Sequence, residues 1–227
     1  MYKNNYRYER KFFITELSKS ELESIIKLHP GRFAEIFHKR FVNNIYFDSP
    51  GMNNYFDNVH GNLQRIKTRI RWYGKLFGYI DKPKLELKIK NGSLGRKETY
   101  TLCPFKLDES FNIEKTSDIM GTSDVPEIVA EKLKSLNPVL LNSYTRKYYQ
   151  SMDQRFRLTI DTNQVFYKIG IQNNSFLYKT SDDINVILEL KYNKDNDENA
   201  EYISNHFPFR LTKSSKYVTG IDKLYVN

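Results

Sequence analysis

One segment alternates so strictly between basic and apolar residues that it points to a β-rich fold. Residues 65–73 read Arg-Ile-Lys-Thr-Arg-Ile-Arg-Trp-Tyr. With a period of two, basic side chains fall on one face and β-branched or aromatic ones on the other, which favours a strand over a helix. Like charges about 7 Å apart along a strand face are destabilising unless an anion lies among them. The segment therefore predicts either a solvated sheet face or an anion-binding surface.

The same alternation recurs along the chain. Segments 6–14, 85–90, 140–150, 154–162 and 185–192 each combine an apolar face with a face of Arg, Lys and occasional Glu. An open sheet with a solvated charged face would allow this pattern. A closed antiparallel barrel would also allow it, with charged faces lining the lumen and apolar faces covered by helices. We expect the barrel, because the strand charges are mostly basic and because amphipathic helices need a surface to cover.

Helix and turn signals separate these strands. Ser18-Lys19-Ser20-Glu21 has capping-box spacing and predicts a helix to about residue 29. Residues 126–136 predict a helix with Ile128, Val129, Leu133 and Leu136 inward, and further helices are expected over 196–207 and near the C-terminus. Asn91-Gly92 predicts a hairpin whose second strand covers residues 95–103. We expect a strand over 34–47 that is interrupted near 42–44, an irregular stretch over 104–125 and a hairpin over 165–178.

Composition restricts the partner and the compartment. The 227 residues carry a net charge of +9, so a polyanion is expected: nucleotide, polyphosphate, nucleic acid or an acidic surface. No apolar run is long enough to span a membrane, and the N-terminus lacks the apolar core of a signal peptide. The single Cys103 suits a reducing, cytoplasmic environment. With no internal repeat and no low-complexity linker, we expect residues 1–227 to form one domain.

Several segments resemble one family when they are taken together and in order. The segments are Tyr8-Glu9-Arg10-Lys11-Phe12, Asn44-Ile45-Tyr46-Phe47-Asp48, Arg69-Ile70-Arg71, Leu85-Glu86-Leu87-Lys88, Ser143-Tyr144-Thr145-Arg146, Ile187-Leu188-Glu189-Leu190-Lys191 and Leu211-Thr212-Lys213-Ser214-Ser215-Lys216-Tyr217. They resemble the catalytic domain of the vacuolar transporter chaperone (VTC) polyphosphate polymerases. That domain belongs, with the CYTH triphosphatases, to the triphosphate tunnel metalloenzymes. The resemblance spans residues 6–225.

This resemblance implies an α+β fold in which a closed eight-stranded antiparallel β-barrel with flanking helices binds a triphosphate and a divalent metal, Mn²⁺ or Mg²⁺. Glu189 would be the metal ligand. Glu9 and Glu86 are second candidates for that role, or salt-bridge partners of nearby lysines. Arg155 and Lys191 are further possible site residues. The implied phosphate-binding residues are Lys11, Arg69, Arg71, Lys88, Tyr144, Arg146, Arg157, Lys213, Ser215 and Lys216.

The implied chemistry is consistent with these residue types. Phosphoryl transfer needs alignment and charge neutralisation, which arginine forks, lysines and a metal supply. One departure bears on the reaction. Tunnel triphosphatases share an opening Glu-x-Glu-x-Lys, whereas this chain reads Arg7-Tyr8-Glu9-Arg10-Lys11. Fewer carboxylates favour a phosphate acceptor over water.

Three functions remain open from the sequence. The first is a polyphosphate polymerase that transfers the γ-phosphate of ATP to a growing chain. The second is a triphosphatase acting on tripolyphosphate or nucleoside triphosphates, and the third is a non-catalytic polyphosphate-binding module. Nucleic acid ranks last as a partner, because its usual signature is an exposed basic patch with interleaved stacking aromatics. The sequence does not indicate a protein partner.

Overall fold

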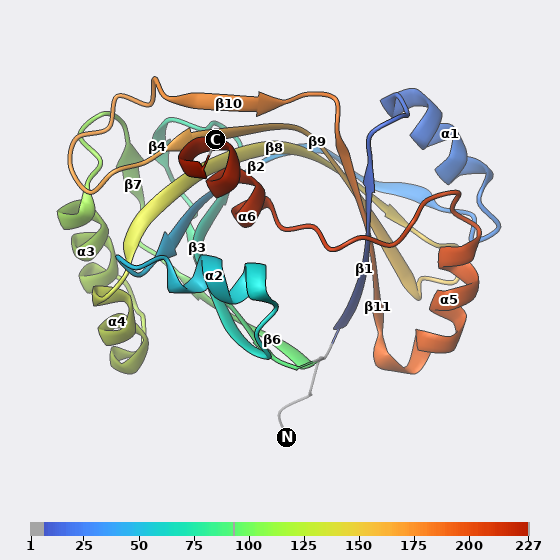
Figure 1. Ribbon diagram of the computed structural model, residues 1–227, viewed down its shortest axis with the longest axis horizontal. Helices are drawn as coiled ribbons and strands as arrows, with labels where there is room; N and C mark the ends of the chain where they lie inside the picture. The colour runs from blue at the N-terminus through green and yellow to red at the C-terminus, as the bar shows by residue number, and fades with distance from the viewer. Residues whose placement is uncertain (1–6, 93, 227) are drawn as a thin grey trace. The chain divides into compact units, whose positions relative to one another are not determined.

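Figure 1 shows the computed structural model, which describes residues 7–92 and 94–226. The fold is α+β, with one large antiparallel sheet, a small two-stranded sheet and six α-helices among the described residues. Tyr6, the first residue of the first expected strand, lies outside them. The elements are β1 (Arg7–Ile14), α1 (Lys19–Leu28), β2 (Ala34–Asp48), α2 (Asn53–His60), β3 (Gln64–Tyr73), β4 (Gly78–Ile80), β5 (Lys84–Asn91), β6 (Leu94–Thr101), β7 (Phe105–Leu107), α3 (Ile113–Thr122), α4 (Glu127–Lys134), β8 (Asn137–Gln150), β9 (Phe156–Lys168), β10 (Lys179–Asp182), β11 (Val186–Asn193), η1 (Lys194–Asn196), α5 (Asp197–Asn205), α6 (Lys216–Ile221) and η2 (Asp222–Val226).

The large sheet is open, so the expected closed eight-stranded barrel was wrong for the described residues. The sheet has nine strands in the order β1-β11-β9-β8-β2-β3-β5-β6, with β10 paired to β9. A physical reason is visible at β1, where a coil occupies the edge that a closing strand would need. Phe12 forms an isolated bridge with Leu211, and the Thr212 amide donates to the Lys11 carbonyl over 2.8 Å.

The chain forms two compact units, each described by itself. Unit 1 comprises Met1–Arg40, Tyr144–Gln164 and Asp182–Ser214, and unit 2 comprises Phe41–Ser143, Val165–Ser181 and Ser215–Asn227. The strands β2, β8 and β9 run through both units. No helix among the described residues is both long and apolar enough to cross a membrane.

Unit 1 packs the apolar faces of its strands against α1 and α5 (Figure 1). Strand β11 lies between β1 and β9, so that Leu188 pairs with Phe12 on one side and Ile160 on the other. These side chains form one core with Leu22 of α1 and Ile203 of α5. The predicted capping box is confirmed, since Ser18 and Glu21 exchange side-chain and backbone hydrogen bonds. The opposite face of the same strands carries the charged residues.

Unit 2 covers the apolar face of β3 and β5 with α3, α4 and the β4–β7 pair. Trp72 is in this core and packs edge-on against Phe105. The helix α3 corrects the expectation of an irregular stretch over 104–125. Asn112 caps this helix by accepting a hydrogen bond from the Lys115 amide. Burial of one face of the helix stabilises it, although the polar composition of the segment gives no sign of that burial. In α4, Val129 and Leu133 are buried as predicted, Leu136 just beyond its end is half-buried, and Ile128 is exposed, contrary to the prediction.

Two expected breaks in strands are absent from the described residues. Strand β2 continues through Asn43 and Asn44, because both side chains form hydrogen bonds with residues of β8. Strand β9 continues to Lys168 through Asn163, which adopts a φ of 52°. Asparagine tolerates this left-handed conformation, so the backbone changes direction without ending the strand. The hairpin expected over 165–178 is confirmed in part: β10 pairs with β9, and the Lys168 amide donates to the Tyr178 carbonyl over 2.9 Å, but β10 begins at Lys179, just beyond the expected range.

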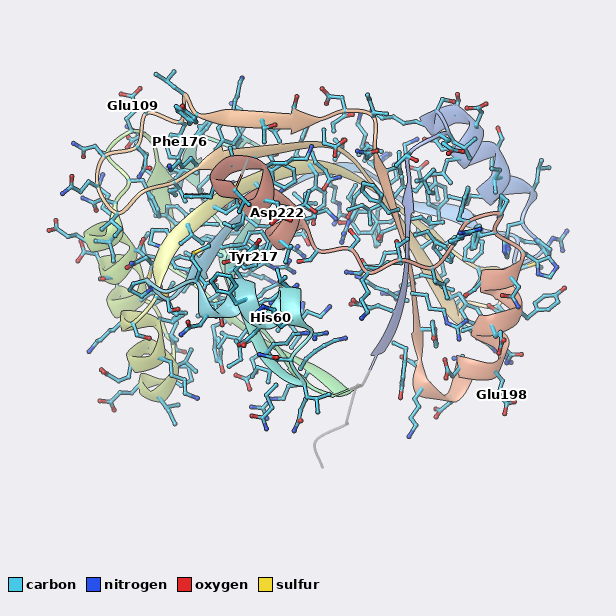
Figure 2. The ribbon with its side chains drawn as sticks, viewed as in Figure 1. His60, Glu109, Phe176, Glu198, Tyr217 and Asp222 are labelled. Atoms are coloured by element: carbon cyan, nitrogen blue, oxygen red, sulfur yellow. The ribbon has the colours of Figure 1, made fainter. Side chains whose placement is uncertain are left out.

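The predicted C-terminal helix is confirmed as α6, followed by η2, in unit 2. Figure 2 shows Tyr217 and Asp222 on this segment, close to α2. The Tyr217 hydroxyl donates to the buried Asp48 carboxylate, and Tyr55 of α2 donates to Asp222 over 2.6 Å. Gly220 allows close packing, because a Cβ there would lie 2.5 Å from a methyl group of Leu140.

Candidate functional site

In unit 2, one buried carboxylate gathers three basic side chains. The register of β3 and β5 places Arg69 opposite Glu86, so both side chains lie on the same sheet face. Arg69 donates to one oxygen of Glu86 from Nε at 2.9 Å and from Nη2 at 2.6 Å. Arg71 approaches the same oxygen at 3.6 Å, and Lys97 of β6 donates to the other at 3.0 Å. The arrangement holds two guanidinium groups beside each other on a partly exposed surface.

The charge state of Glu86 follows from these contacts. Burial by itself would raise the pKa of the carboxyl, but Arg69, Arg71 and Lys97 outweigh burial and lower it well below the usual range. Glu86 is therefore ionised at neutral pH and organises the arginines. A carboxylate held in this way is a poor proton acceptor.

We expect Glu86→Gln to lower the free energy of unfolding at pH 7 by about 3 kcal/mol, because it leaves partly buried cations without their counter-charge. The pKa of Glu86 is lower in the folded than in the unfolded state, so the unfolded chain takes up the extra proton on acidification. The stability from these contacts is present at neutral pH and is lost as the pH falls below the ordinary value of 4.5. Urea unfolding from pH 3 to 7 should show a shallower acid slope in the variant. Glu98→Gln, which removes the partner of exposed Arg96, should cost under about 1 kcal/mol; equal losses would contradict the assignment.

Polar neighbours fix both guanidinium groups. Arg71 Nε donates to the Asn44 side-chain oxygen at 2.8 Å. Arg69 Nη1 donates to the Tyr46 hydroxyl at 3.3 Å, and its guanidinium carbon lies 5.9 Å from the centre of that ring. Asn44 and Tyr46 lie on β2, opposite Arg71 and Arg69. Fixed donors of this kind suit the recognition of phosphate oxygens.

Further basic residues continue the same face of unit 2. Lys88 lies on β5 in register with Lys67 of β3 and Lys97 of β6. Lys67 Nζ donates to Ser215 Oγ at 2.7 Å, and Ser215 is also the N-cap residue of α6. Lys216 is the first residue of that helix. Ser215 therefore links the strand lysines to the C-terminal segment.

In unit 1, Glu189 occupies a similar position. It is buried on β11, with Lys191 at 3.0 Å, Lys11 at 3.5 Å and Arg146 at 3.8 Å. Arg146 in turn forms a bidentate pair with buried Asp161, at 2.5 Å from Nε and 2.6 Å from Nη2. This pair fixes the plane of the guanidinium group.

Electrostatics keep two cations of this cluster, Lys11 and Arg146, charged. Burial lowers the pKa of Lys11, but Glu189 and Glu9 outweigh burial, and the net shift is upward. Burial likewise opposes the charge on Arg146, while Asp161 and other neighbours raise its pKa well above the ordinary value. The buried Tyr144 ring lies 5.3 Å from the Arg146 guanidinium carbon, in cation–π geometry.

The remaining predicted residues lie outside these closest contacts. Arg157 is exposed on β9, in register with Lys191, which in turn is in register with Glu9 of β1. Arg155 is exposed and pairs with Asp153 at 3.8 Å. Lys213 is exposed in the coil before α6.

The described residues include no group of three or more His, Cys, Asp or Glu side chains that could hold a metal ion. Mg²⁺, however, is commonly held by one or two carboxylates together with substrate phosphates. Glu189 fits that donor set if phosphate oxygens complete the coordination shell of the metal ion. The phosphates would then also replace Glu189 as the partners of Lys11 and Lys191. A bare cation does not fit, because cationic side chains contact both carboxylate oxygens of Glu189.

Sequence reasoning missed several residues of these clusters. Asp161 was noticed only as one member of a charged strand face, and Asn44 only as part of a motif. Neither position has a local signal for its role, because the role depends on which residue lies opposite or diagonally across the sheet. The others that the structure adds are Tyr46, Lys67 and Lys97.

Comparison with known proteins identifies the family to which the chain belongs. A family model described as VTC domain matches residues 6–225, which is nearly the whole chain. The chain belongs to the VTC-domain family. Among curated proteins, none matches the chain.

Two solved structures are similar over 95% of this chain. One, from Vibrio parahaemolyticus, is provisionally described as an adenylate cyclase; it has a TM-score of 0.52 and 9% identity, with 97% of that chain covered. The other is the PH1819 protein from Pyrococcus horikoshii OT3, with a TM-score of 0.49, 12% identity and 96% of that chain covered. At 9% identity, the Vibrio protein shows a shared fold alone.

Proposed function

We propose that this chain is a metal-dependent polyphosphate polymerase that transfers the γ-phosphate of ATP to the end of an inorganic polyphosphate chain. Membership of the VTC-domain family supports a function related to polyphosphate or triphosphate. The cationic cluster of each unit supports the same class of ligand. Because one family match covers segments of both units, we also propose that residues 1–227 act as one functional domain.

One observation favours a phosphate acceptor over water. Glu86, Glu189 and Asp161 are each engaged by cationic side chains. Hydrolysis is helped by a carboxylate that is available to accept a proton from water. These three carboxylates are committed to positioning cations, which is what transfer between two phosphates requires. The arginine that replaces the first glutamate of the triphosphatase motif, Arg7, agrees with this reading.

In this proposal the protein residues bind and orient the substrate phosphates. Arg69, Arg71 and Lys88 in unit 2, and Lys11 and Arg146 in unit 1, neutralise phosphate oxygens as charge develops. The other proposed phosphate contacts are Tyr144, Arg157, Lys213, Ser215 and Lys216. Glu189 would hold Mn²⁺ or Mg²⁺ together with the phosphates, where the ion would neutralise negative charge.

The direct test incubates purified protein with ATP and Mn²⁺ and follows ADP, free phosphate and long-chain polyphosphate together. We expect ADP and polyphosphate to accumulate in step, with little free phosphate. Nucleotide loss matched by free phosphate or pyrophosphate would identify a triphosphatase instead. Binding of triphosphate without turnover would contradict the catalytic proposal and leave a binding module.

A second prediction concerns binding alone. Tripolyphosphate at about a thousand times its Kd should add roughly 4 kcal/mol to the free energy of unfolding. For a chain of this length, that corresponds to an increase in Tm of roughly 10 °C. Differential scanning calorimetry with tripolyphosphate, against sulfate at equal ionic strength, checks this. An equal shift with sulfate would contradict a dedicated site for linked phosphates.

A further inference from the structure

Two buried asparagines in unit 2 form a hydrogen-bonded pair next to the arginines. Asn44 of β2 and Asn142 of β8 are both 0% exposed. Asn44 lies opposite Arg71 in the β2–β3 register, and its Nδ2 lies 2.9 Å from the side-chain oxygen of Asn142. Two amide side chains do not contribute to an apolar core, so their burial requires hydrogen-bond partners.

The orientation of both amides follows from Arg71. A guanidinium group has only donors, so the Asn44 atom that it contacts at 2.8 Å must be the oxygen. The Asn44 nitrogen therefore faces Asn142 and donates to the Asn142 oxygen. The hydrogen-bonded series Arg71–Asn44–Asn142 therefore ends at Asn142 Nδ2, which is a donor.

That last donor is the unusual feature. Asn142 Nδ2 is buried and has no hydrogen-bond partner among residues 7–92 and 94–226. Buried amide groups in native proteins are almost always paired, so an orphaned one requires an explanation. Turning the Asn142 amide over would place two amide nitrogens against each other. The fixed orientation leaves this donor without an acceptor among the residues that the structure describes.

The neighbouring pair on the same two strands shows that this is not a general consequence of the packing. Ser143 Oγ donates to the Asn43 side-chain oxygen at 2.7 Å. Asn43 Nδ2 donates to the carbonyls of Gly74 and Lys75 at 3.1 and 3.3 Å. Asn43 and Ser143 therefore satisfy each other and the adjacent backbone, and they provide a matched control.

We infer that Asn142 donates a hydrogen bond to a phosphate oxygen of the polyphosphate substrate, and that Asn44 positions both this amide and the Arg71 guanidinium. The inference rests on the proposed function, because it assigns a further binding residue to the same substrate. An anionic acceptor fits, since the series begins at a guanidinium group beside Arg69 and Glu86. A neutral amide adds a direction-specific donor to a site that otherwise recognises charge.

The test compares tripolyphosphate binding by wild type, Asn142→Asp and Ser143→Ala, using isothermal titration calorimetry at fixed ionic strength. Asn142→Asp keeps the acceptor for Asn44, replaces the orphaned donor with an oxygen and adds a negative charge that itself weakens binding of a polyanion. We expect its Kd to rise by at least about 10- to 100-fold, the effect of one hydrogen bond to a charged group, with the repulsion added to it. Ser143→Ala should bind within about twofold of wild type. An unchanged Kd in a folded Asn142→Asp variant would overturn the inference.

A second measurement uses wild-type protein, so it does not depend on the variant folding. The side-chain amide protons of Asn142, assigned by triple-resonance NMR, should shift and exchange more slowly with water as tripolyphosphate is added. Unchanged Asn142 protons, with shifted backbone signals of Arg69 and Arg71, would show binding without this contact and overturn the inference alone. A wild type that binds no tripolyphosphate would instead contradict the proposed function.

Discussion

Replacing Glu189 with glutamine is expected to abolish turnover, with kcat reduced by about 10³-fold or more, while tripolyphosphate binding without metal persists. Glutamine keeps the size of the side chain but removes the charge that would hold a divalent cation. It also releases Lys11, Lys191 and Arg146 from their shared carboxylate. Cations without that counter-charge attract a polyanion at least as strongly. The result should therefore be a loss in kcat without a loss in metal-free affinity.

Three measurements check this prediction: polyphosphate synthesis, tripolyphosphate titration without metal, and Mn²⁺ binding followed by electron paramagnetic resonance with tripolyphosphate present. Glu23→Gln is a matched control, because Glu23 pairs with Lys147 in the same unit at 2.6 Å and has no part in the Glu189 cluster. That variant should retain turnover. Full activity in Glu189→Gln, or unaltered Mn²⁺ binding, would remove Glu189 from the proposed metal site.

Replacing Arg71 is expected to have the second large effect, with Arg71→Ala lowering kcat about 10²- to 10³-fold. The contacts that fix this guanidinium group include Asn44 at Nε and Glu86 at Nη1. Lysine would keep the charge but would lose the planar fork and its fixed direction. We therefore expect Arg71→Lys to lie between alanine and wild type, roughly tenfold below wild type, the value of one hydrogen bond.

Steady-state kinetics of ADP release, with circular dichroism to confirm folding, separates these variants. Arg96→Ala removes an exposed arginine of the same unit that pairs with Glu98, and it should leave kcat within about twofold. If Arg71→Ala is folded and fully active, phosphate binding by the unit 2 cluster is not needed for the reaction. Loss of turnover in both Arg71→Ala and Glu189→Gln would show that both clusters serve one reaction.

Much of the secondary structure could be predicted because its signals are local. Strand β3 follows from the alternation of Lys67, Arg69 and Arg71 with Ile70 and Trp72, and the two faces have the predicted burial. The start of α1 follows from a capping box that needs only four consecutive residues. The charged faces of β1, β5 and β11 were predicted in the same way, because a period of two assigns each side chain to a face.

Other elements could not be predicted, because long-range contacts decide them. The polar stretch before α4 contains α3, which is held by burial of Ile119 and Met120 in the core of unit 2. Asn43 and Asn44 are typical of turns, but they lie inside β2 because Asn43 accepts a hydrogen bond from Ser143 and Asn44 donates one to Asn142, both on β8. The open sheet also depends on a distant segment, since the coil at Leu211 and Thr212 occupies the edge of β1.

The sequence by itself determined that the strands would be two-faced and that the charged faces would be mostly basic, and its net charge of +9 predicted a polyanion as the ligand. Net charge is a sum over the side chains and alternation is a period along the sequence, so neither requires knowledge of the fold. Only the tertiary structure decided which cations share a carboxylate. Strand register and side-chain direction bring Glu86 to Arg69, Glu189 to Lys11 and Asn142 to Asn44 across gaps of 17 to 178 residues in sequence. At the 2.6 to 3.5 Å that separate these pairs, electrostatic and hydrogen-bond energies depend on such pairing and not on composition.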